Sequence, residues 1–276
     1  MKVSDHFIKK IIDQKKLSSS GFFDKERMEI FVTELYHILF LQQPVNTGDQ
    51  LQKEFEELHT ILLDLLKNTG EDEVSALEKT DRFFHVLPDI YSHLILDAES
   101  VLKFDPATES LEEILLSYPG FFATYVYRIS HQLWNQKVKT LPRVISEYAH
   151  SRTGIDIHPG AVIGKHFFID HGTGIVIGET TVIGNHVKIY QGVTLGALNV
   201  SKEKANEKRH PNIEDHVIIY SGATILGGNT TIGRDSIIGG NVWITQNVPS
   251  NSLVYNKSEI RIKDNGILPE SLTFVI

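Results

Sequence analysis

An aliphatic residue returns every six positions through the second half of the chain. This period matches neither the 3.6-residue repeat of a helix nor the alternation of an ordinary strand. It is typical of a hexapeptide parallel β-helix, in which each hexad gives one short strand and one turn, and three hexads complete one triangular coil. The inward residues are expected to stack on their equivalents one coil further along, about 4.8 Å away. The repeat positions are Ile157, Ile163, Ile169, Ile177, Ile183, Ile189 and Leu195, then Ile213, Ile219, Ile225, Ile232, Ile238 and Ile244.

The six-residue register breaks where polar residues gather. From Ile169 to Ile177 the step is eight residues, so two extra residues are predicted to bulge out within 171–175. Between residues 195 and 213 the intervening hexad positions are polar and cannot fill an apolar core. We therefore predict a loop over 197–210 that leaves the prism, because loops carried by a rigid scaffold often hold binding groups.

The first half of the chain shows the spacing of amphipathic helices instead. A helix is predicted over 121–136, and the segment Tyr118-Pro119-Gly120 separates it from the helices before it. Another candidate helix over 74–97 has Pro88 within its pattern. The stripes of two further helices are Ile30, Phe31, Leu35, Ile38 and Leu39, and Leu51, Phe55, Leu58, Leu62 and Leu65.

These patterns predict an α+β protein with two domains and a tail. An all-helical domain over 1–150 is expected to serve packing and oligomerisation, residues 151–250 to form the β-helix, and 251–276 to be a carboxy-terminal tail. The period does not fix the hand of the coil. Left-handed coils are the usual form of this repeat, although parallel crossovers are generally right-handed, so we predict a left-handed parallel β-helix.

Composition narrows the partners and the chemistry. The 276 residues carry a formal net charge of -8 with a pI near 5.9, and basic residues are scattered, so a nucleic-acid partner is not indicated. No run of eighteen apolar residues occurs and residues 1–16 contain no apolar leader, so we expect a cytoplasmic protein without a membrane partner. The absence of cysteine excludes disulfides, thiolate metal sites and a cysteine nucleophile.

Candidate acid–base chemistry lies at the register breaks. His171 stands in the predicted bulge, Asp156 lies fifteen residues earlier, and the predicted loop ends with Lys208-Arg209-His210. Histidine suits proton transfer because its ordinary pKa lies near the working pH. An imidazole, a carboxylate less than one coil away and a basic loop together indicate a site for acid–base catalysis.

At these residues the chain resembles the serine acetyltransferases, which make O-acetylserine on the route to cysteine. The resemblance spans residues 95–250 and includes the helical domain as well as the hexads, which alone would indicate only an acyltransferase-like scaffold. The segments that carry it are Asp156-Ile157-His158-Pro159-Gly160-Ala161, Asp170-His171-Gly172-Thr173-Gly174-Ile175-Val176-Ile177-Gly178-Glu179-Thr180, Gly192-Val193-Thr194-Leu195-Gly196, Arg209-His210-Pro211, Phe104-Asp105-Pro106-Ala107 and Tyr127-Arg128-Ile129-Ser130-His131-Gln132-Leu133-Trp134-Asn135.

This resemblance implies an enzyme that passes acetyl from acetyl-CoA directly to the hydroxyl of L-serine, without an acyl-enzyme. At the matching positions His171 is implied as the general base, and Asp156 as the carboxylate that fixes its tautomer and orientation. Direct transfer agrees with the absence of cysteine. A backbone N–H within 192–196 could bind the developing oxyanion, and the sequence does not choose which.

The resemblance also implies how a zwitterionic acceptor is held. Arg209 offers a planar fork for the carboxylate, while Asp105 and Asp170 offer negative charge for the ammonium, so the helical domain would form part of the serine site. His210 matches a histidine that the family places against the substrate or the inhibitor cysteine. Without the resemblance, Asp105 before a proline is a common helix-start device, and Arg209 is a solvated loop charge.

In this superfamily acetyl-CoA lies along a groove between neighbouring prisms, so the resemblance implies a homotrimer. A dimer of trimers through the helical domain is left open, and no metal is expected. Two segments depart from the family, since Ala197-Leu198-Asn199 replaces a glycine-rich run and residues 255–260 replace a segment of small residues and proline. The candidate cofactor contacts are Gly196, Gly222, Gly240 and Lys257.

The last residue of the sequence is Ile276. Members of the family often end in isoleucine, and that residue enters the active site of cysteine synthase. Phe274-Val275-Ile276 could dock in the same way, and a frayed tail is the alternative.

Two other classes of function remain open from the sequence. A sugar or other small-alcohol O-acetyltransferase uses a histidine on the same scaffold but generally lacks so long a helical domain, and a sugar has no ammonium for Asp105 to hold. A non-enzymatic scaffold, or a metal-dependent hydrolase resembling γ-class carbonic anhydrase, is the third hypothesis, and the hydrolase needs three histidines that converge on zinc. The histidines whose spacing raises this question are His158, His166, His171, His186, His210 and His216.

Overall fold

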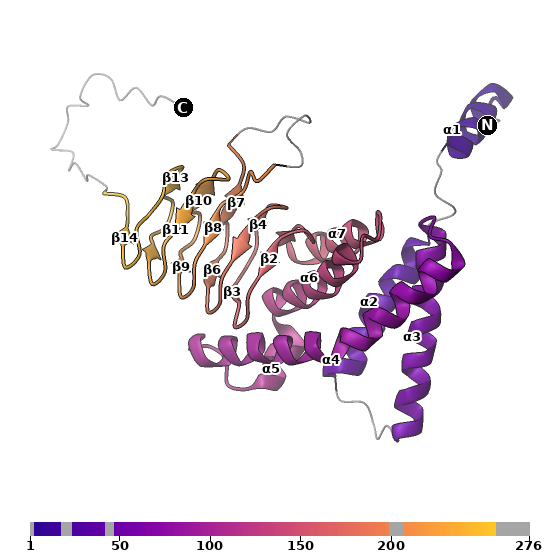
Figure 1. The fold of residues 1–276 in the computed structure, drawn as a ribbon, viewed down its shortest axis with the longest axis horizontal. Coiled ribbons are helices and arrows are strands. Elements are labelled where there is room, and N and C mark those ends of the chain that lie inside the picture. The colour runs from indigo at the N-terminus through magenta and orange to yellow at the C-terminus, as the bar shows by residue number, and fades with distance from the viewer. Residues whose placement is uncertain (1–2, 18–23, 42–46, 199–206, 258–276) are drawn as a thin grey trace, which may run out of the picture.

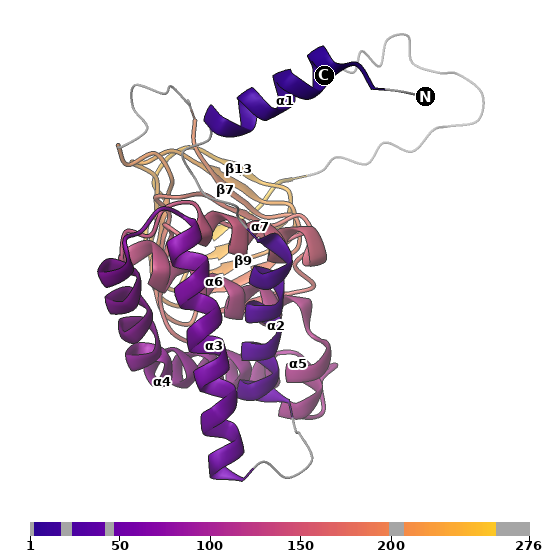
Figure 2. The same cartoon turned by 90° about the vertical axis from the view of Figure 1, so that its right-hand side faces the viewer.

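The computed structural model describes residues 3–17, 24–41, 47–198 and 207–257. Within these ranges seven helices precede a parallel β-helix. Helices α4, α6 and α7 contact the first strands of the prism, and α2 and α3 pack on the outer side of these helices (Figures 1 and 2). The helices are α1 (Asp5–Leu17), α2 (Lys25–Phe40), α3 (Gly48–Asn68), α4 (Glu73–Phe104), α5 (Leu111–Ser117), α6 (Pro119–Asn135) and α7 (Leu141–Thr153).

The long helix α4 carries one of the predicted site residues at its end. Its N-cap is Asp72, whose side chain accepts hydrogen bonds from the backbone N–H groups of residues 74 and 75. The helix continues through Pro88 for 32 residues. Proline removes one backbone donor, but Leu87 and Leu94 on either side are buried in the bundle and keep the helix packed. Asp105 is the C-cap, and its extended backbone turns the chain away from the helix axis.

The strands form three parallel sheets that make the faces of a left-handed prism, which confirms the predicted fold class. Sheet A has the order β1-β4-β7-β10-β13, sheet B is β2-β5-β8-β11, and sheet C is β3-β6-β9-β12-β14. The strands are β1 (Asp156–Ile157), β2 (Val162–Ile163), β3 (Phe168–Asp170), β4 (Val176–Ile177), β5 (Val182–Ile183), β6 (Lys188–Tyr190), β7 (Thr194–Gly196), β8 (Asn212–Ile213), β9 (Ile218–Ile219), β10 (Thr224–Leu226), β11 (Thr231–Ile232), β12 (Ile237–Ile238), β13 (Trp243–Ile244) and β14 (Leu253–Val254).

The hexad positions fill the interior of the prism. All thirteen aliphatic residues of the repeat are at most 8% exposed. They pair in register from coil to coil, so that in sheet A Ile157 lies beside Ile177, Ile177 beside Leu195, and Leu195 beside Ile225. Each coil therefore buries its apolar side chains only against the coils next to it, as the period predicts.

Two corners of the prism matter for the site. The C–A corner is the turn from sheet C to sheet A, and the eight-residue step lies there, between β3 and β4. The A–B corner is the turn from sheet A to sheet B. There β7 ends at Gly196 and β8 begins at Asn212, and residues 199–206 of the predicted loop lie outside the described residues. Residues 258–276, including Ile276, also lie outside them.

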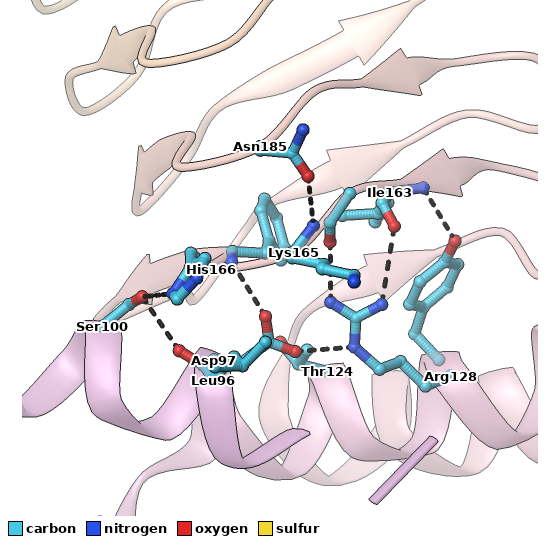
Figure 3. Close-up of polar contacts among 12 residues, drawn as sticks. Leu96, Asp97, Ser100, Thr124, Arg128, Ile163, Lys165, His166 and Asn185 are labelled. Atoms are coloured by element: carbon cyan, nitrogen blue, oxygen red, sulfur yellow. Dashed lines mark hydrogen bonds and ion pairs between the residues drawn. The ribbon is translucent and has the colours of Figure 1, made fainter. Parts of the chain in front are cut away.

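A buried ion pair joins the helical domain to the prism (Figure 3). Arg128 of α6 donates from Nε to Asp97 of α4 at 2.6 Å, and its Nη2 donates to the carbonyl of Gly164 at 2.8 Å. Asp97 in turn accepts from the backbone N–H of Phe167 at 2.9 Å. Both ends of the pair thus contact the chain between β2 and β3, which holds α4 and its terminal Asp105 against the prism.

Candidate functional site

His171 lies at the C–A corner, directly after β3. Its backbone is in the left-handed region with φ 56°, and Gly172 follows with φ 89°. A Cβ on Gly172 would lie 2.4 Å from Cδ1 of Ile155, so this tight corner requires glycine. The imidazole is 72% exposed, and its Nε2 lies 3.7 Å from Oδ1 of Asp170. The corner therefore presents an accessible imidazole with a carboxylate beside it.

Asp105 and Asp170 meet at the same corner from different domains. The Asp105 carboxylate accepts a hydrogen bond of 2.8 Å from the backbone N–H of Ala107 and one of 2.7 Å from the hydroxyl of Tyr118. Burial raises the pKa of Asp170, the His171 charge lowers it, and the negative charge of Asp105 raises it again. The two carboxylates therefore feel each other's charge, and a cation placed at this corner would relieve their repulsion.

Two stacked tyrosine rings lie on the coils that follow Asp170. Tyr190 pairs in register with Asp170, and its ring stacks on Tyr220 at a centroid distance of 5.0 Å. Burial raises the pKa of Tyr190, and the charges of Asp170, Tyr220 and Asp105 raise it further. Tyr190 therefore faces both acids as a neutral phenol.

Asp156 has different neighbours from those that the sequence predicts. It begins β1, and one of its carboxylate oxygens lies within 4.8 Å of a ring nitrogen of His150 and an oxygen of Glu147. Neither hydrogen bond nor ion pair links Asp156 to His171, both of which lie in the described part of the chain, and the carboxylate in ion-pair range of His171 is Asp170. The pairing of Asp156 with His171 stays a prediction.

Arg209 and His210 lie at the A–B corner. Arg209 forms an ion pair with Glu179, which follows β4. Nδ1 of His210 accepts hydrogen bonds from the backbone N–H of Thr180 at 3.1 Å and from its hydroxyl at 2.9 Å, so Nε2 carries the proton of the neutral ring. A Cβ on Gly178 would lie 2.0 Å from Cδ2 of His210, so the glycine makes room for the ring.

The electrostatics of the A–B corner keep its histidines neutral. Burial, together with the charges of Arg209 and Lys208, lowers the pKa of His210 to about 4. Burial also lowers the pKa of His158 to about 4, and its Nδ1 accepts from the backbone N–H of Gly160 at 3.0 Å. At neutral pH both rings are uncharged donors through Nε2, and Arg209 supplies the positive charge.

Within one chain the predicted substrate residues fall into two groups. Asp105, Asp170 and His171 gather at the C–A corner, while Arg209 and His210 gather at the A–B corner, on the other side of the sheet A face. A single chain does not bring the two groups together.

A column of small residues runs along the C–A corner above His171. The Cα of Gly192 lies 3.5 Å from where a Cβ of Gly174 would be, and the Cα of Gly222 is equally close to a Cβ placed on Gly192. A Cβ on Gly222 would lie 2.2 Å from Oδ1 of Asn241. The column leaves backbone exposed along the prism edge, and glycine is also needed there for the coil to close.

The predicted cofactor residues are spread over both corners. Gly222 and Gly240 lie at the C–A corner, whereas Gly196 ends β7 at the A–B corner. Lys257 is exposed at the end of the described residues.

Three histidines of the prism stack in a geometry that does not suit a shared metal ion. His166, His186 and His216 stack face to face, with ring centroids 4.2 and 4.7 Å apart, so their nitrogens do not converge on a point. Among the residues that the structure describes, Glu147, His150 and Asp156 are the only group of three possible ligands close to one another. The three-histidine centre that a γ-class hydrolase needs is therefore not found in this part of the chain.

Two contacts of the site were missed from the sequence. Glu179 pairs with Arg209, and Tyr118 donates to Asp105. Glu179 stands beside Gly178 in a segment that carries the resemblance, and that position could have identified it as a candidate site residue. Tyr118 was interpreted only as a boundary before a helix, and nothing in the periodicity indicates its partner.

No helix in the described ranges has the length and apolar character needed to cross a membrane. No protein-family model matches the chain.

Proteins named serine acetyltransferase match this chain over about two thirds of its length. A protein named serine acetyltransferase, plasmid, from Synechococcus elongatus is 49% identical over 191 residues, which are 67% of this chain and 59% of that protein. Serine acetyltransferase from Staphylococcus aureus is 46% identical over 171 residues, which are 62% of this chain and 78% of that protein. The match thus spans less than two thirds of the Synechococcus protein.

Solved structures agree over most of the chain. Entamoeba histolytica serine acetyltransferase isoform 3 in complex with cysteine has a TM-score of 0.77 and 34% identity, and covers 90% of this chain and 86% of its own. Serine acetyltransferase 1 from the same organism in complex with L-cysteine has a TM-score of 0.75 and 38% identity, and covers 86% and 88%. With both domains matched and this identity, the chain belongs to the serine acetyltransferase family.

Proposed function

We propose that this protein is a serine O-acetyltransferase, which transfers acetyl from acetyl-CoA to the hydroxyl of L-serine and gives O-acetylserine for cysteine synthesis. The observation that carries the proposal is the meeting of Asp105, Asp170 and His171 at one corner. It combines two carboxylates for an ammonium group with an accessible base for a neighbouring hydroxyl.

In this mechanism His171 acts as the general base in a direct transfer. It removes the serine hydroxyl proton as the oxygen attacks the thioester carbonyl, and later returns a proton to the departing thiolate of CoA. A positioned base of this kind contributes about 10² to 10⁴ in rate. Asp156 is proposed to orient the imidazole once the assembled site closes, and a backbone N–H within 192–196 to bind the oxyanion.

Serine is proposed to bind between two copies of the chain. Its ammonium meets Asp105 and Asp170 at the C–A corner, and its carboxylate meets Arg209 from the A–B corner of the next prism. The separation of these corners within one chain supports a homotrimer with three shared sites. His210, as a neutral Nε2–H donor beside Arg209, adds a hydrogen bond to the acceptor. A dimer of trimers through the helical domain remains an alternative assembly.

Acetyl-CoA is proposed to lie along the glycine column of the C–A corner, where Gly222 and Gly240 expose backbone, with Gly196 contributed from the A–B corner of the neighbour. Lys257 is proposed as a contact for phosphate, and the proposed reaction uses no metal. The tail is proposed to dock on cysteine synthase through Ile276. The two Entamoeba histolytica relatives solved with cysteine support an amino-acid site in this fold.

The main alternative acceptor is a sugar or another small alcohol. Two carboxylates that repel each other favour a cationic group between them, which a sugar lacks. The acids at the C–A corner therefore favour serine.

The test is CoA release from acetyl-CoA by the purified protein on addition of L-serine. We expect turnover with L-serine and none with homoserine, maltose or a galactoside at the same concentration. Turnover with one of those alcohols and not with L-serine would show that the acceptor assignment is wrong.

A further inference from the structure

Both oxygens of the Asp105 carboxylate are held by donors of the helical domain. The hydroxyl of Tyr118 donates to Oδ2 at 2.7 Å, and the backbone N–H of Ala107 donates to Oδ1 at 2.8 Å. We propose that Tyr118 is a positioning residue, which fixes the Asp105 carboxylate for the ammonium group of the acceptor and so selects amino-acid acceptors over plain hydroxy acids. This inference rests on the proposed function and assigns a residue to its specificity.

Asp105 needs such a restraint because it faces a second carboxylate. The charge of Asp105 raises the pKa of Asp170, and by the same interaction Asp170 repels Asp105. Asp105 has left the helix, since it is the C-cap of α4 and is followed by Pro106. In the absence of a cation at the corner, the repulsion favours rotation of the Asp105 side chain away from it. The hydroxyl of Tyr118 opposes that rotation.

Tyr118 stays a donor across the pH range in which an enzyme of this kind works. Burial raises the pKa of Tyr118, and its hydrogen bond to Asp105 raises it further. The phenol therefore keeps its proton, and its bond to an ionised carboxylate is of the stronger, charge-assisted kind.

The backbone of Tyr118 is anchored to the strand that carries the second acid. Tyr118 is the N-cap of α6 and precedes Pro119, whose ring suits the first position of a helix. At Gly120 the helix touches β3 directly, because a Cβ there would lie 2.7 Å from the carbonyl oxygen of Ile169, the residue before Asp170. Tyr118 thus sets the position of Asp105 relative to Asp170, and not merely within its own loop.

The experiment replaces Tyr118 by phenylalanine and compares two acceptors. We expect Tyr118→Phe to raise KM for L-serine about tenfold, the size expected for losing a hydrogen bond to a charged group, while kcat and KM for acetyl-CoA change by less than about twofold. With 3-hydroxypropionate, which has the hydroxyl and the carboxylate but no ammonium, kcat/KM should stay near the wild-type value. The preference for L-serine over 3-hydroxypropionate should therefore fall about tenfold.

The matched control is Tyr36→Phe. The hydroxyl of Tyr36 donates to the carbonyl of Leu115 at 2.6 Å in the same domain, so this change removes a phenol hydrogen bond without removing a donor to Asp105. This variant should lose stability and keep both kinetic constants for L-serine. In a second measurement, Tyr118→Phe made in an Asp105→Asn background should add no further loss, because the hydroxyl acts through that carboxylate.

Each outcome of these experiments either supports or contradicts the role of Tyr118. If the wild type turns over L-serine but Tyr118→Phe leaves the preference unchanged, or lowers kcat equally for both acceptors, Tyr118 is only structural and the inference is wrong while the proposed function stands. An additive loss in the Asp105→Asn background also overturns it. If the wild type neither turns over nor binds L-serine, the proposed function fails, and this inference with it.

Discussion

Asp105 and Asp170 are 65 residues apart in the chain, yet each feels the other's charge at one corner of the prism. His171 beside them has positive φ, but so do His166, His186 and His216 at other corners. A histidine at a corner is therefore a common device of this fold. What distinguishes His171 is the carboxylate of Asp170 at 3.7 Å, whereas the other three rings stack on one another.

Replacing His171 by alanine tests the base directly. Because the proposed base is removed but the corner retains Gly172, kcat should fall about a hundredfold or more, while the circular dichroism spectrum and the oligomeric state remain as in the wild type. His216→Ala is the control, since His216 has φ 62° and is also exposed but has no place in the mechanism. Equal turnover in the two variants would remove His171 from the chemistry.

Helix α4 holds Asp105 at the C–A corner because α4 and α6 are joined to the prism by a buried ion pair. The side chains of Arg128 and Asp97 are 7% and 2% exposed, and both also bind backbone groups between β2 and β3. Removing one partner of a buried pair leaves the other charge without compensation. This ion pair is therefore important for stability and for the position of α4.

Arg128→Met should lower the free energy of unfolding by about 3–5 kcal/mol, measured by urea titration, because it leaves Asp97 buried without its partner. Arg143→Met, which breaks the exposed pair with Glu147, should cost about 0–1 kcal/mol. If both variants lose the same small amount, the buried pair does not fasten the two domains. A folded Arg128→Met should also show a raised KM for L-serine, since α4 carries Asp105.

At the level of the assembled protein, the face of sheet A keeps the acids and the base apart from Arg209 and His210. The proposed serine site therefore combines the C–A corner of one prism with the A–B corner of another. Cyclic symmetry would repeat that contact at each interface of a trimer.

Mixing two inactive variants tests this shared site. His171→Ala lacks the base and Arg209→Ala lacks the carboxylate clamp, so each alone should be nearly inactive at low serine concentration. After the two are refolded together, about a quarter of the interfaces should combine an intact C–A corner with an intact A–B corner, and activity should return to about that fraction. Mixed trimers without recovered activity would show that each site is built within one chain.

Much of the prism could be predicted from the sequence because its contacts are local in a repeating sense. Ile189 packs on Ile169 and Ile219, which hold the equivalent repeat position one coil before it and one coil after it, so the residues that mark the period are also the residues that form the core. The helices α3 and α6 could be predicted for a similar reason, because their apolar stripes repeat within each helix. Pro88 interrupts the helical pattern in the sequence, but α4 continues through it because residues on both sides of the proline are buried.

The site was less predictable because its contacts cross between elements. The hexads place His171 at a corner, and the choice of Asp105 as its neighbour came from resemblance and not from any spacing. The hydrogen bond from Tyr118 to Asp105 and the ion pair of Glu179 with Arg209 depend on how helices and loop pack on the prism. Periodicity along the chain specifies what faces inward, whereas the partners of polar side chains at the corners depend on three-dimensional packing, which no repeat encodes.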